Sequence, residues 1–246
     1  MPPATPHRLI IMPAHNEAGN LPRVIAEVRA AAPGYDLVVI DDGSTDRTAT
    51  VAAGLGAAVV TLPVNLGYGG AVQTGFRYAV RHGYDLAVVM DADGQHDPFG
   101  VPQLAGPVLA GEVDVAIGSR FRGRMDYHQP WVKRVGMSIF AWTVSRITGR
   151  EVTDPTSGYQ ALNRSALRFF AYDNYPSDYP DADTLLVLYY AGFRVSEIPV
   201  TMRERISGVS MHSGLKPIYY VLKMWLAIGI VLLRHGTRAS ARKVDA

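Results

Sequence analysis

The sequence of 246 residues contains no cysteine. Disulfide bonds, thiolate nucleophiles and thiolate metal ligands are therefore excluded. Charged residues make up only 19% of the chain and the net charge is +2, so we expect no nucleic-acid partner. Residues 1–8 lack an apolar stretch ahead of a cleavage site, so we expect no secretory signal and a cytoplasmic location.

Apolar residues, at 48%, are abundant enough for a full core in a chain of this length. The length suits one domain with an appendage better than two domains. In the first half, helix-like segments alternate with short apolar runs at residues 9–12, 37–40, 59–60, 86–90 and 113–117. This alternation predicts an α/β fold with a mostly parallel sheet covered by helices on both faces. Ligands of such sheets bind beyond the carboxyl ends of the strands.

The helices between these strands are expected from apolar residues at helical spacing. Asn20 can cap a helix that presents Leu21, Val24, Ile25 and Val28 on one face, and Ser44 or Thr45 can cap a second helix. A third is expected at 72–80. After Gly118 the alternation stops, and we expect a helix at 131–147, another within 168–194 and a strand at 193–200.

Two carboxylates, Asp91 and Asp93, stand one residue apart at the end of an apolar strand. Like charges this close repel each other unless a divalent cation lies between them and a phosphate. Oxygen ligands favour Mg²⁺ or Mn²⁺ over Zn²⁺. A solvated turn is the alternative interpretation, because Asp-Ala-Asp-Gly also suits a loop.

Three other strand ends carry polar or glycine-rich motifs. Residues 13–17 end the first strand and 41–44 the second, with two more carboxylates at Asp41 and Asp42. Residues 65–71 follow the third strand; they lack the Lys-Ser/Thr ending of a P-loop, and their position excludes the dinucleotide fingerprint. Four such ends on one rim are hard to explain as four unrelated turns.

With these motifs the sequence resembles glycosyltransferase family 2, with its GT-A fold, and within it the dolichyl- and polyprenyl-phosphate sugar synthases. The resemblance spans nearly the whole chain. It is carried by residues 13–17, 41–44, 65–71, 91–96, 118–120, 153–159, 179–183, 197–200 and 205–210. These motifs are highly specific for the superfamily and less specific for donor and acceptor.

On the donor side, the resemblance implies a nucleoside pocket lined by Pro13, His15, Glu17, Ile40 and Asp42. It places the ribose and diphosphate over Asp91, Ala92 and Asp93, with the metal, Mg²⁺ or Mn²⁺, held by Asp93 and Gln95. Arg205 would close over the diphosphate. Arginine is well suited to binding phosphate through two hydrogen bonds.

On the acceptor side, the resemblance implies a phosphate site made by Arg120, Arg134 and Ser138. The catalytic residues would then be Asp93, Arg120, Arg134 and Arg205. Without the resemblance, Arg134 would be interpreted as an ordinary surface charge.

Three of the motifs depart from the family pattern. His15 replaces a usual aromatic residue, which bears on base recognition. Met211-His212 stands where a lysine often follows, so His212 or Lys216 must substitute for that charge or it is absent. Asp181 and Asp183 replace the usual glutamates and have a shorter reach.

The resemblance implies a metal-dependent, inverting transfer of a sugar from GDP-mannose or a UDP-hexose to a polyprenyl phosphate. One alternative is transfer to a saccharide or small-molecule hydroxyl, which needs a general base, with Asp154, Asp181 and Asp183 as candidates. A nucleotidyltransferase is disfavoured because the sequence has no glycine- and lysine-rich loop near its N-terminus. A non-catalytic nucleotide-sugar-binding subunit is a further alternative.

We expect a catalytic domain at 1–210, with a nucleotide-sugar half at 1–118 and an acceptor half at 119–210. Residues 211–246 would form a helix and a basic tail. The apolar segment 217–233 is short for a membrane span and is interrupted by Lys223, so it suits an interfacial helix. A helix packed on the core or on a partner subunit is the alternative. The protein would be peripheral on the cytoplasmic face of the membrane, where a separate membrane protein is a possible partner.

Overall fold

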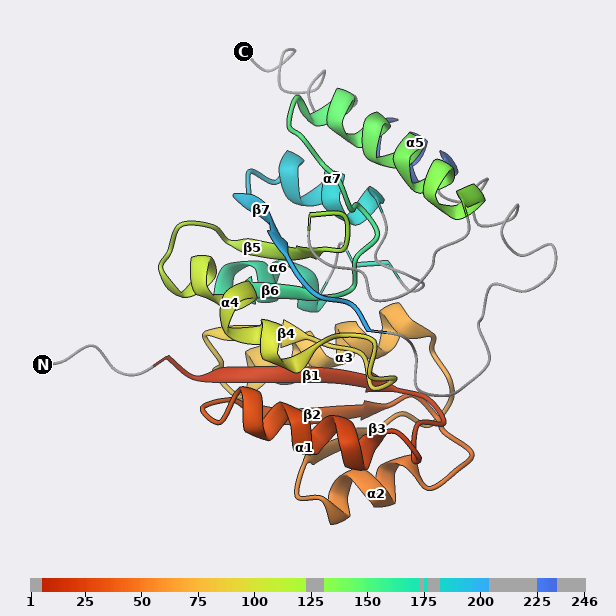
Figure 1. Cartoon of the computed structure of the whole chain (residues 1–246), viewed down its shortest axis with the longest axis vertical. Helices are drawn as coiled ribbons and strands as arrows, with labels where there is room; N and C mark the ends of the chain where they lie inside the picture. Colours follow the sequence, from red (N-terminus) through yellow and green to blue (C-terminus); the bar gives the residue numbers. More distant parts are fainter. Residues whose placement is uncertain (1–5, 123–130, 173–174, 177–181, 204–224, 234–246) are drawn as a thin grey trace, which may run out of the picture.

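The computed structural model describes residues 6–122, 131–172, 175–176, 182–203 and 225–233, with only the backbone described at 131–136 (Figure 1). A seven-stranded sheet runs through it in the order β3-β2-β1-β4-β6-β5-β7. Its strands are β1 Arg8–Ala14, β2 Asp36–Asp41, β3 Ala58–Thr61, β4 Leu86–Val89, β5 Val115–Ser119, β6 Gln160–Asn163 and β7 Val195–Pro199. Strand β6 is antiparallel to both neighbours and the other pairings are parallel. The predicted α/β class with a mostly parallel sheet is confirmed.

The helices cover both faces of this sheet (Figure 1). They are α1 Leu21–Ala31, α2 Thr48–Gly54, α3 Tyr68–Arg81, α4 Val101–Leu109 after the short 3₁₀ turn η1 Pro98–Gly100, α5 Trp131–Thr148, α6 Arg164–Tyr172 and α7 Ala182–Tyr190. Residues 225–233 form a further helical segment.

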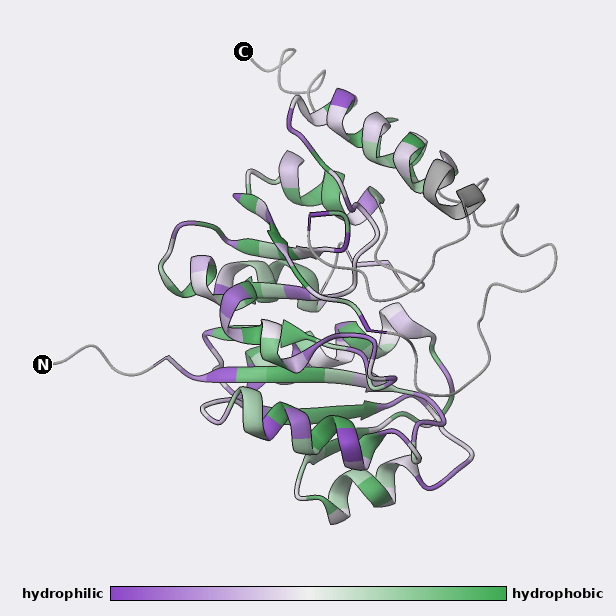
Figure 2. Cartoon of the chain, viewed as in Figure 1, coloured by the Kyte–Doolittle hydropathy of each residue, from purple (hydrophilic) through white to green (hydrophobic). Residues whose placement is uncertain are grey.

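The central strands are hydrophobic along most of their length because both of their faces are covered (Figure 2). Alternate residues of β1 enter two separate cores. Ile11 packs on the face of α3 and α6, where Phe76 and Phe170 stack with ring centroids 5.9 Å apart. Ile10 packs on the opposite face with residues of α1 and α4, including Leu21.

The expected caps of the first two helices differ from those observed. Asn20 does precede α1, but its side chain donates to Glu17 instead of capping the helix. The capping of α2 by Ser44 or Thr45 is wrong, since α2 begins only at Thr48. Both residues bond to Asn16 instead, at the end of β1.

The second half contains two elements that the sequence pattern did not reveal. Strand β6 is one of them, because only Ala161 and Leu162 of its four residues are apolar. The other is a second helix between residues 164 and 194, where one was expected. Pro176 and Pro180 lie between α6 and α7, and proline does not continue a helix. Helix α5 agrees with the prediction.

The described part of the C-terminal apolar segment packs beside α5 (Figure 1). Its Trp225 ring lies 5.5 Å from that of Phe140, and Ile228 is buried in the core. Within the described residues, no helix is both long and apolar enough to cross a membrane.

Candidate active site at the carboxyl edge of the sheet

The carboxyl ends of β1, β2 and β4 meet at one edge because these strands are parallel. The antiparallel strand β6 starts at this same edge, where Gln160 pairs with Val89. The loop before β6, residues 153–159, therefore lies at the rim that also carries Asp91 and Asp93. The predicted gathering of strand-end motifs on one rim is confirmed, and β6 adds a motif from the second half of the chain.

The loops after β1 and β2 are held together by side-chain hydrogen bonds. His15 donates from Nδ1 to the carbonyl oxygen of Asp42 at 2.8 Å. Asn16 adopts a positive φ of 58° and accepts the backbone N–H groups of Thr45 and Asp46. Asn16 thus fixes the position of His15 beside it, a role that the sequence analysis did not assign.

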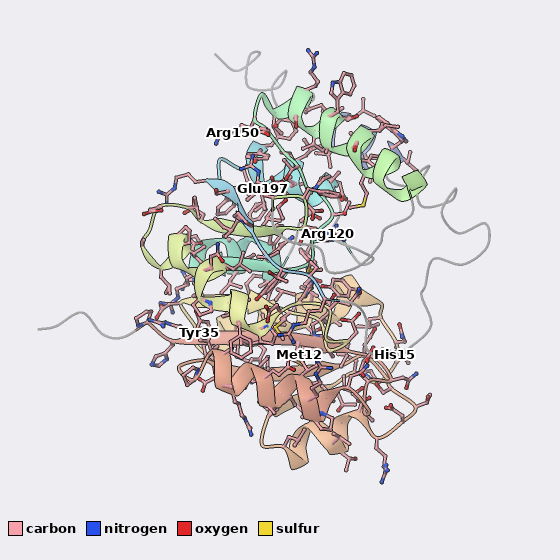
Figure 3. All side chains as sticks on the ribbon, in the orientation of Figure 1. Met12, His15, Tyr35, Arg120, Arg150 and Glu197 are labelled. Atoms are coloured by element: carbon pink, nitrogen blue, oxygen red, sulfur yellow. The ribbon has the colours of Figure 1, made fainter. Side chains whose placement is uncertain are left out.

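The remaining residues predicted for the nucleoside pocket lie at different depths. Pro13 is buried, Glu17 is partly buried and His15 is exposed at the carboxyl end of β1 (Figure 3). The side chain of Ile40 is fully buried in the core, on the face of α3 and α6.

Asp42 is engaged by the glycine-rich loop that enters α3. Its carboxylate, only 4% exposed, accepts the N–H groups of Leu66 at 2.7 Å and Gly67 at 3.0 Å. Asp42 therefore fixes the position of this loop.

Asp91 is held from two sides. The Tyr68 hydroxyl donates to its Oδ1 at 2.8 Å, and its own N–H donates to Nδ1 of His96 at 3.0 Å. Burial lowers the pKa of His96 to about 4, because a buried imidazolium would lose its hydration. The His96 ring is neutral near pH 7 and stacks on Tyr159 with centroids 4.7 Å apart.

These residues fit a hard divalent cation. Asp93 is almost buried and its Oδ1 accepts the N–H of Gln95 at 2.9 Å. Nδ1 of His96 accepts the Asp91 N–H and so is not free to bind a metal. The ligands that the rim offers to a metal are therefore oxygen atoms. Among the described residues, no group of three or more acidic, histidine or cysteine side chains could enclose a metal ion. Mg²⁺ sites completed by substrate phosphates need only one or two carboxylates.

On the other side of the rim, Arg120 follows β5 and is bound to Asp154. Its Nε and Nη2 donate to the two oxygens of Asp154 at 2.7 and 2.6 Å, and Nη2 also donates to Thr156. Asp154 is fully buried. It is therefore no candidate for a general base, since both of its oxygens already bind a guanidinium. This corrects one expectation of the hydroxyl-acceptor alternative.

The Asp154 turn is held in place by Glu197 of β7, a residue to which the sequence analysis gave no role. The carboxylate of Glu197 accepts the N–H groups of Thr153 and Asp154, both at 2.8 Å, and the hydroxyl of Thr153. Figure 3 shows Glu197 and Arg120 in the same half of the molecule, apart from His15. The turn could be found from sequence only as a motif, because the partner carboxylate lies more than 40 residues away.

The other predicted acceptor residues are placed in part. Ser138 is exposed on α5, and position 134, one helical turn earlier, lies on the same face of that helix. Asp183 lies in the first turn of α7. The side chains of Arg134, Asp181, Arg205, Met211, His212 and Lys216 lie outside the described residues.

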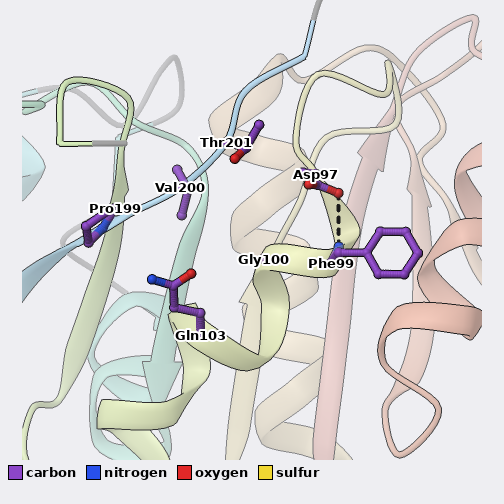
Figure 4. A pocket seen from close by; sticks show the side chains of 7 residues that line it. All are labelled: Asp97, Phe99, Gly100, Gln103, Pro199, Val200 and Thr201. Atoms are coloured by element: carbon purple, nitrogen blue, oxygen red, sulfur yellow. Dashed lines mark hydrogen bonds between the residues drawn. The ribbon is translucent and has the colours of Figure 1, made fainter. Parts of the chain in front are cut away.

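A hollow of about 310 Å³ lies between η1, α4 and the end of β7 (Figure 4). Its carboxylate, Asp97, accepts the N–H of Phe99 and an N–H of Arg203. Arg203 also binds Glu27, and its backbone N–H donates to the carbonyl oxygen of Gln95. These contacts brace the Asp91–His96 loop from behind.

The comparisons with known proteins agree with this geometry. Residues 9–172 match the family described as "Glycosyl transferase family 2". The chain is 37% identical to polyprenol monophosphomannose synthase of Mycolicibacterium smegmatis, over 85% of this chain and 82% of that protein. It is 34% identical to undecaprenyl-phosphate mannosyltransferase of Micrococcus luteus, over 84% of this chain and 87% of that protein.

A solved structure has the same fold. Glucosyl-3-phosphoglycerate synthase of Mycobacterium tuberculosis, in complex with Mn²⁺, UDP and glucosyl-3-phosphoglycerate, superposes with a TM-score of 0.67. The match covers 94% of this chain and 80% of that one at 22% identity. The predicted GT-A architecture is thus confirmed.

Proposed function

This chain belongs to glycosyl transferase family 2, and we propose that it transfers a hexose from a nucleotide-diphosphate sugar to a polyprenyl phosphate. The observation that carries the proposal is one rim that holds Asp91 and Asp93 on one side and the Asp154-bound Arg120 on the other. Two relatives named as polyprenyl-phosphate mannose enzymes support mannose as the sugar, with GDP-mannose as the first donor to test. A UDP-hexose is the second.

We propose the following division of work on the donor side. Pro13, His15, Glu17 and Asp42 would surround the nucleoside, and the buried Ile40 would support Pro13, its partner in the β1–β2 pairing. Asp91, Ala92 and Asp93 would lie under the ribose and diphosphate. Asp93 and Gln95 would hold Mg²⁺ or Mn²⁺, which supplies positive charge against the departing diphosphate. Mn²⁺ in the glucosyl-3-phosphoglycerate synthase complex supports this choice of ion. Arg205 would add a guanidinium on the same diphosphate.

On the acceptor side, Arg120, Arg134 and Ser138 would bind the lipid phosphate. A phosphate monoester, with a second pKa near 6, is largely ionised at pH 7 and needs no general base. The burial of Asp154 against Arg120 supports this acceptor over a hydroxyl. A phosphate oxygen attacks the anomeric carbon as the bond to the diphosphate oxygen breaks, so the electron pair leaves with the nucleoside diphosphate and the configuration inverts.

We also propose that the protein works at the cytoplasmic face of a membrane. Helix α5 and residues 225–233 expose large apolar side chains at Ile139, Trp142, Trp225, Leu226, Ile230, Leu232 and Leu233. Arg146 lies over the Trp142 ring, a pairing suited to a lipid headgroup region. Residues 1–118 would serve the donor, 119–210 the acceptor, and 211–246 the membrane or a separate membrane protein.

The test is nucleoside-diphosphate release by the purified protein with Mn²⁺, across UDP- and GDP-sugars, with and without polyprenyl phosphate. We expect release with one donor that depends on the lipid and falls at least about 100-fold in Asp93→Ala. Release that is indifferent to the lipid would contradict the acceptor assignment and favour a hydroxyl acceptor. No release with any donor and lipid would contradict the function itself and favour a nucleotide-sugar-binding subunit.

A further inference from the structure

The glycine-rich loop at residues 65–71 has no role in the function proposed above, yet it touches two carboxylates of the donor side. Its Leu66 and Gly67 donate backbone N–H groups to Asp42, which follows β2. Tyr68, the first residue of α3, donates its hydroxyl to Asp91, which follows β4. One short loop therefore connects the carboxylates of two different strand ends.

The Tyr68 hydroxyl is a fixed donor. Burial, with the nearby Asp91 charge, raises the pKa of Tyr68 well above its usual value, so the hydroxyl keeps its proton near neutral pH. The ring packs against the core on the face of α3 and α6, which orients the hydroxyl. The acceptor is a carboxylate, and a hydrogen bond to a charged acceptor is stronger than one between neutral groups.

Gly158 lies against this same hydroxyl from the other half of the chain. A Cβ at Gly158 would come within 2.5 Å of the Tyr68 oxygen, but 3.4 Å from the ring carbon that carries it. A methyl group at residue 158 would therefore strike the Tyr68 hydroxyl oxygen but would clear the ring carbons. The loop that holds Arg120 through Asp154 is thus fitted to Tyr68.

We propose that Tyr68 is a positioning residue of the donor site, whose hydroxyl fixes the Asp91 carboxylate for donor binding. The inference rests on the proposed function, because it assigns Asp91 to the bound ribose and diphosphate. Asp91 and Asp93 repel each other, and the hydroxyl limits the orientations that Asp91 can take to avoid its neighbour. The rival explanation is that Tyr68 only fills space at the start of α3.

Tyr68→Phe separates the two explanations because it keeps the ring and removes the hydroxyl. We expect the KM for the donor to rise about 10-fold with a smaller change in kcat. The matched control is Tyr84→Phe. Tyr84 also donates its hydroxyl to an aspartate, Asp36 at 2.9 Å, but at the amino end of β2. The KM and kcat of the Tyr84→Phe variant should stay within about twofold of the wild-type values.

A second set of variants tests the contact with Gly158. Gly158→Ala should lower both Tm and kcat/KM in the wild-type background. In the Tyr68→Phe background, the same substitution should have a clearly smaller effect, because the atom it would strike is gone. Equal effects in both backgrounds would overturn the fitted contact.

The outcomes also separate this inference from the proposed function. If the wild type is active and Tyr68→Phe matches it in donor KM, the inference is wrong and the function stands. If the wild type is inactive with every donor, calorimetry with GDP or UDP and Mn²⁺ replaces the kinetics. Unchanged nucleotide affinity in Tyr68→Phe would then overturn the inference, and affinity weakened about 10-fold would support it.

Discussion

The Arg120–Asp154 pair shows how a charged residue can serve a site and the core together. The Arg120 side chain is 12% exposed and Asp154 is fully buried, so both charges have lost most of their hydration. Each charge therefore needs the other as a partner to replace the contacts with water. Three N–H groups of Arg120 converge on one carboxylate. The guanidinium consequently keeps one orientation toward the rim before any acceptor binds.

Asp154→Asn should destabilise the protein strongly. Removal of one partner leaves a nearly buried guanidinium without its counter-charge, a change that typically costs about 3–5 kcal/mol. Chemical denaturation would measure the free energy of unfolding. Asp114→Asn is the control, because Asp114 also binds both Nε and Nη2 of an arginine, Arg194, but at the surface. An equal loss in both variants would contradict the role of burial.

At the scale of elements, the sequence predicted every strand of the described sheet except β6. Leu9–Met12 and Leu86–Val89 are continuous apolar runs because both faces of a central strand are covered. Strand β6 is central too, but it is four residues long and begins with Gln160, so no period or run marks it. Its place in the sheet depends on pairing with residues more than 40 positions away.

The residues of the candidate site likewise include some that the sequence could predict and some that it could not. Asp91 and Asp93 could be predicted because they directly follow an apolar strand. Glu197 could not be given a role, because its partners come from another loop. The burial of Ile40 follows from its place in β2, where alternate residues face the core under α3. A resemblance of motifs alone does not show toward which face of the sheet a side chain points.

Helix α5 and residues 225–233 form the surface that we expect to bind a membrane. The exposed Trp142 and Ile139 lie on one solvent side of α5, and their replacement by glutamate should weaken binding to anionic lipid vesicles by about 10-fold or more. Vesicle co-sedimentation would measure this. Phe99→Glu is the control, since Phe99 is 60% exposed on η1, away from α5. Equal weakening by the control, or none by the α5 variants, would contradict a membrane role for this surface.

At the scale of the molecule, one continuous sheet carries both sides of the candidate site. Asp91 follows β4 and Arg120 follows β5, with β6 bonded to both strands between them. The distance between the two sides is therefore set by backbone pairing within a sheet.

Nucleotide binding should stabilise the whole fold in a metal-dependent way. A ligand at 100 times its Kd adds about 2.7 kcal/mol to the stability of the folded state. We expect the matching nucleoside diphosphate to raise Tm by several degrees with Mn²⁺ and by much less with a chelator, as read by thermal unfolding. Asp93→Ala should lose the metal-dependent part. An equal rise with and without the metal would argue against Asp93 and Gln95 as its ligands.

The antiparallel insertion of β6 also governs the order in which this sheet can form during synthesis. Strand β5 is made before β6 but lies outside it, so β5 has no place on the growing sheet until residues 160–163 exist. Roughly 70 residues separate β4 from β6, which at about 5–20 residues per second leaves the apolar edge of β4 unpaired for several seconds. An exposed edge of this kind invites pairing with another chain. The late synthesis of the strand that joins the two sides of the rim thus also leaves the nascent protein open to aggregation.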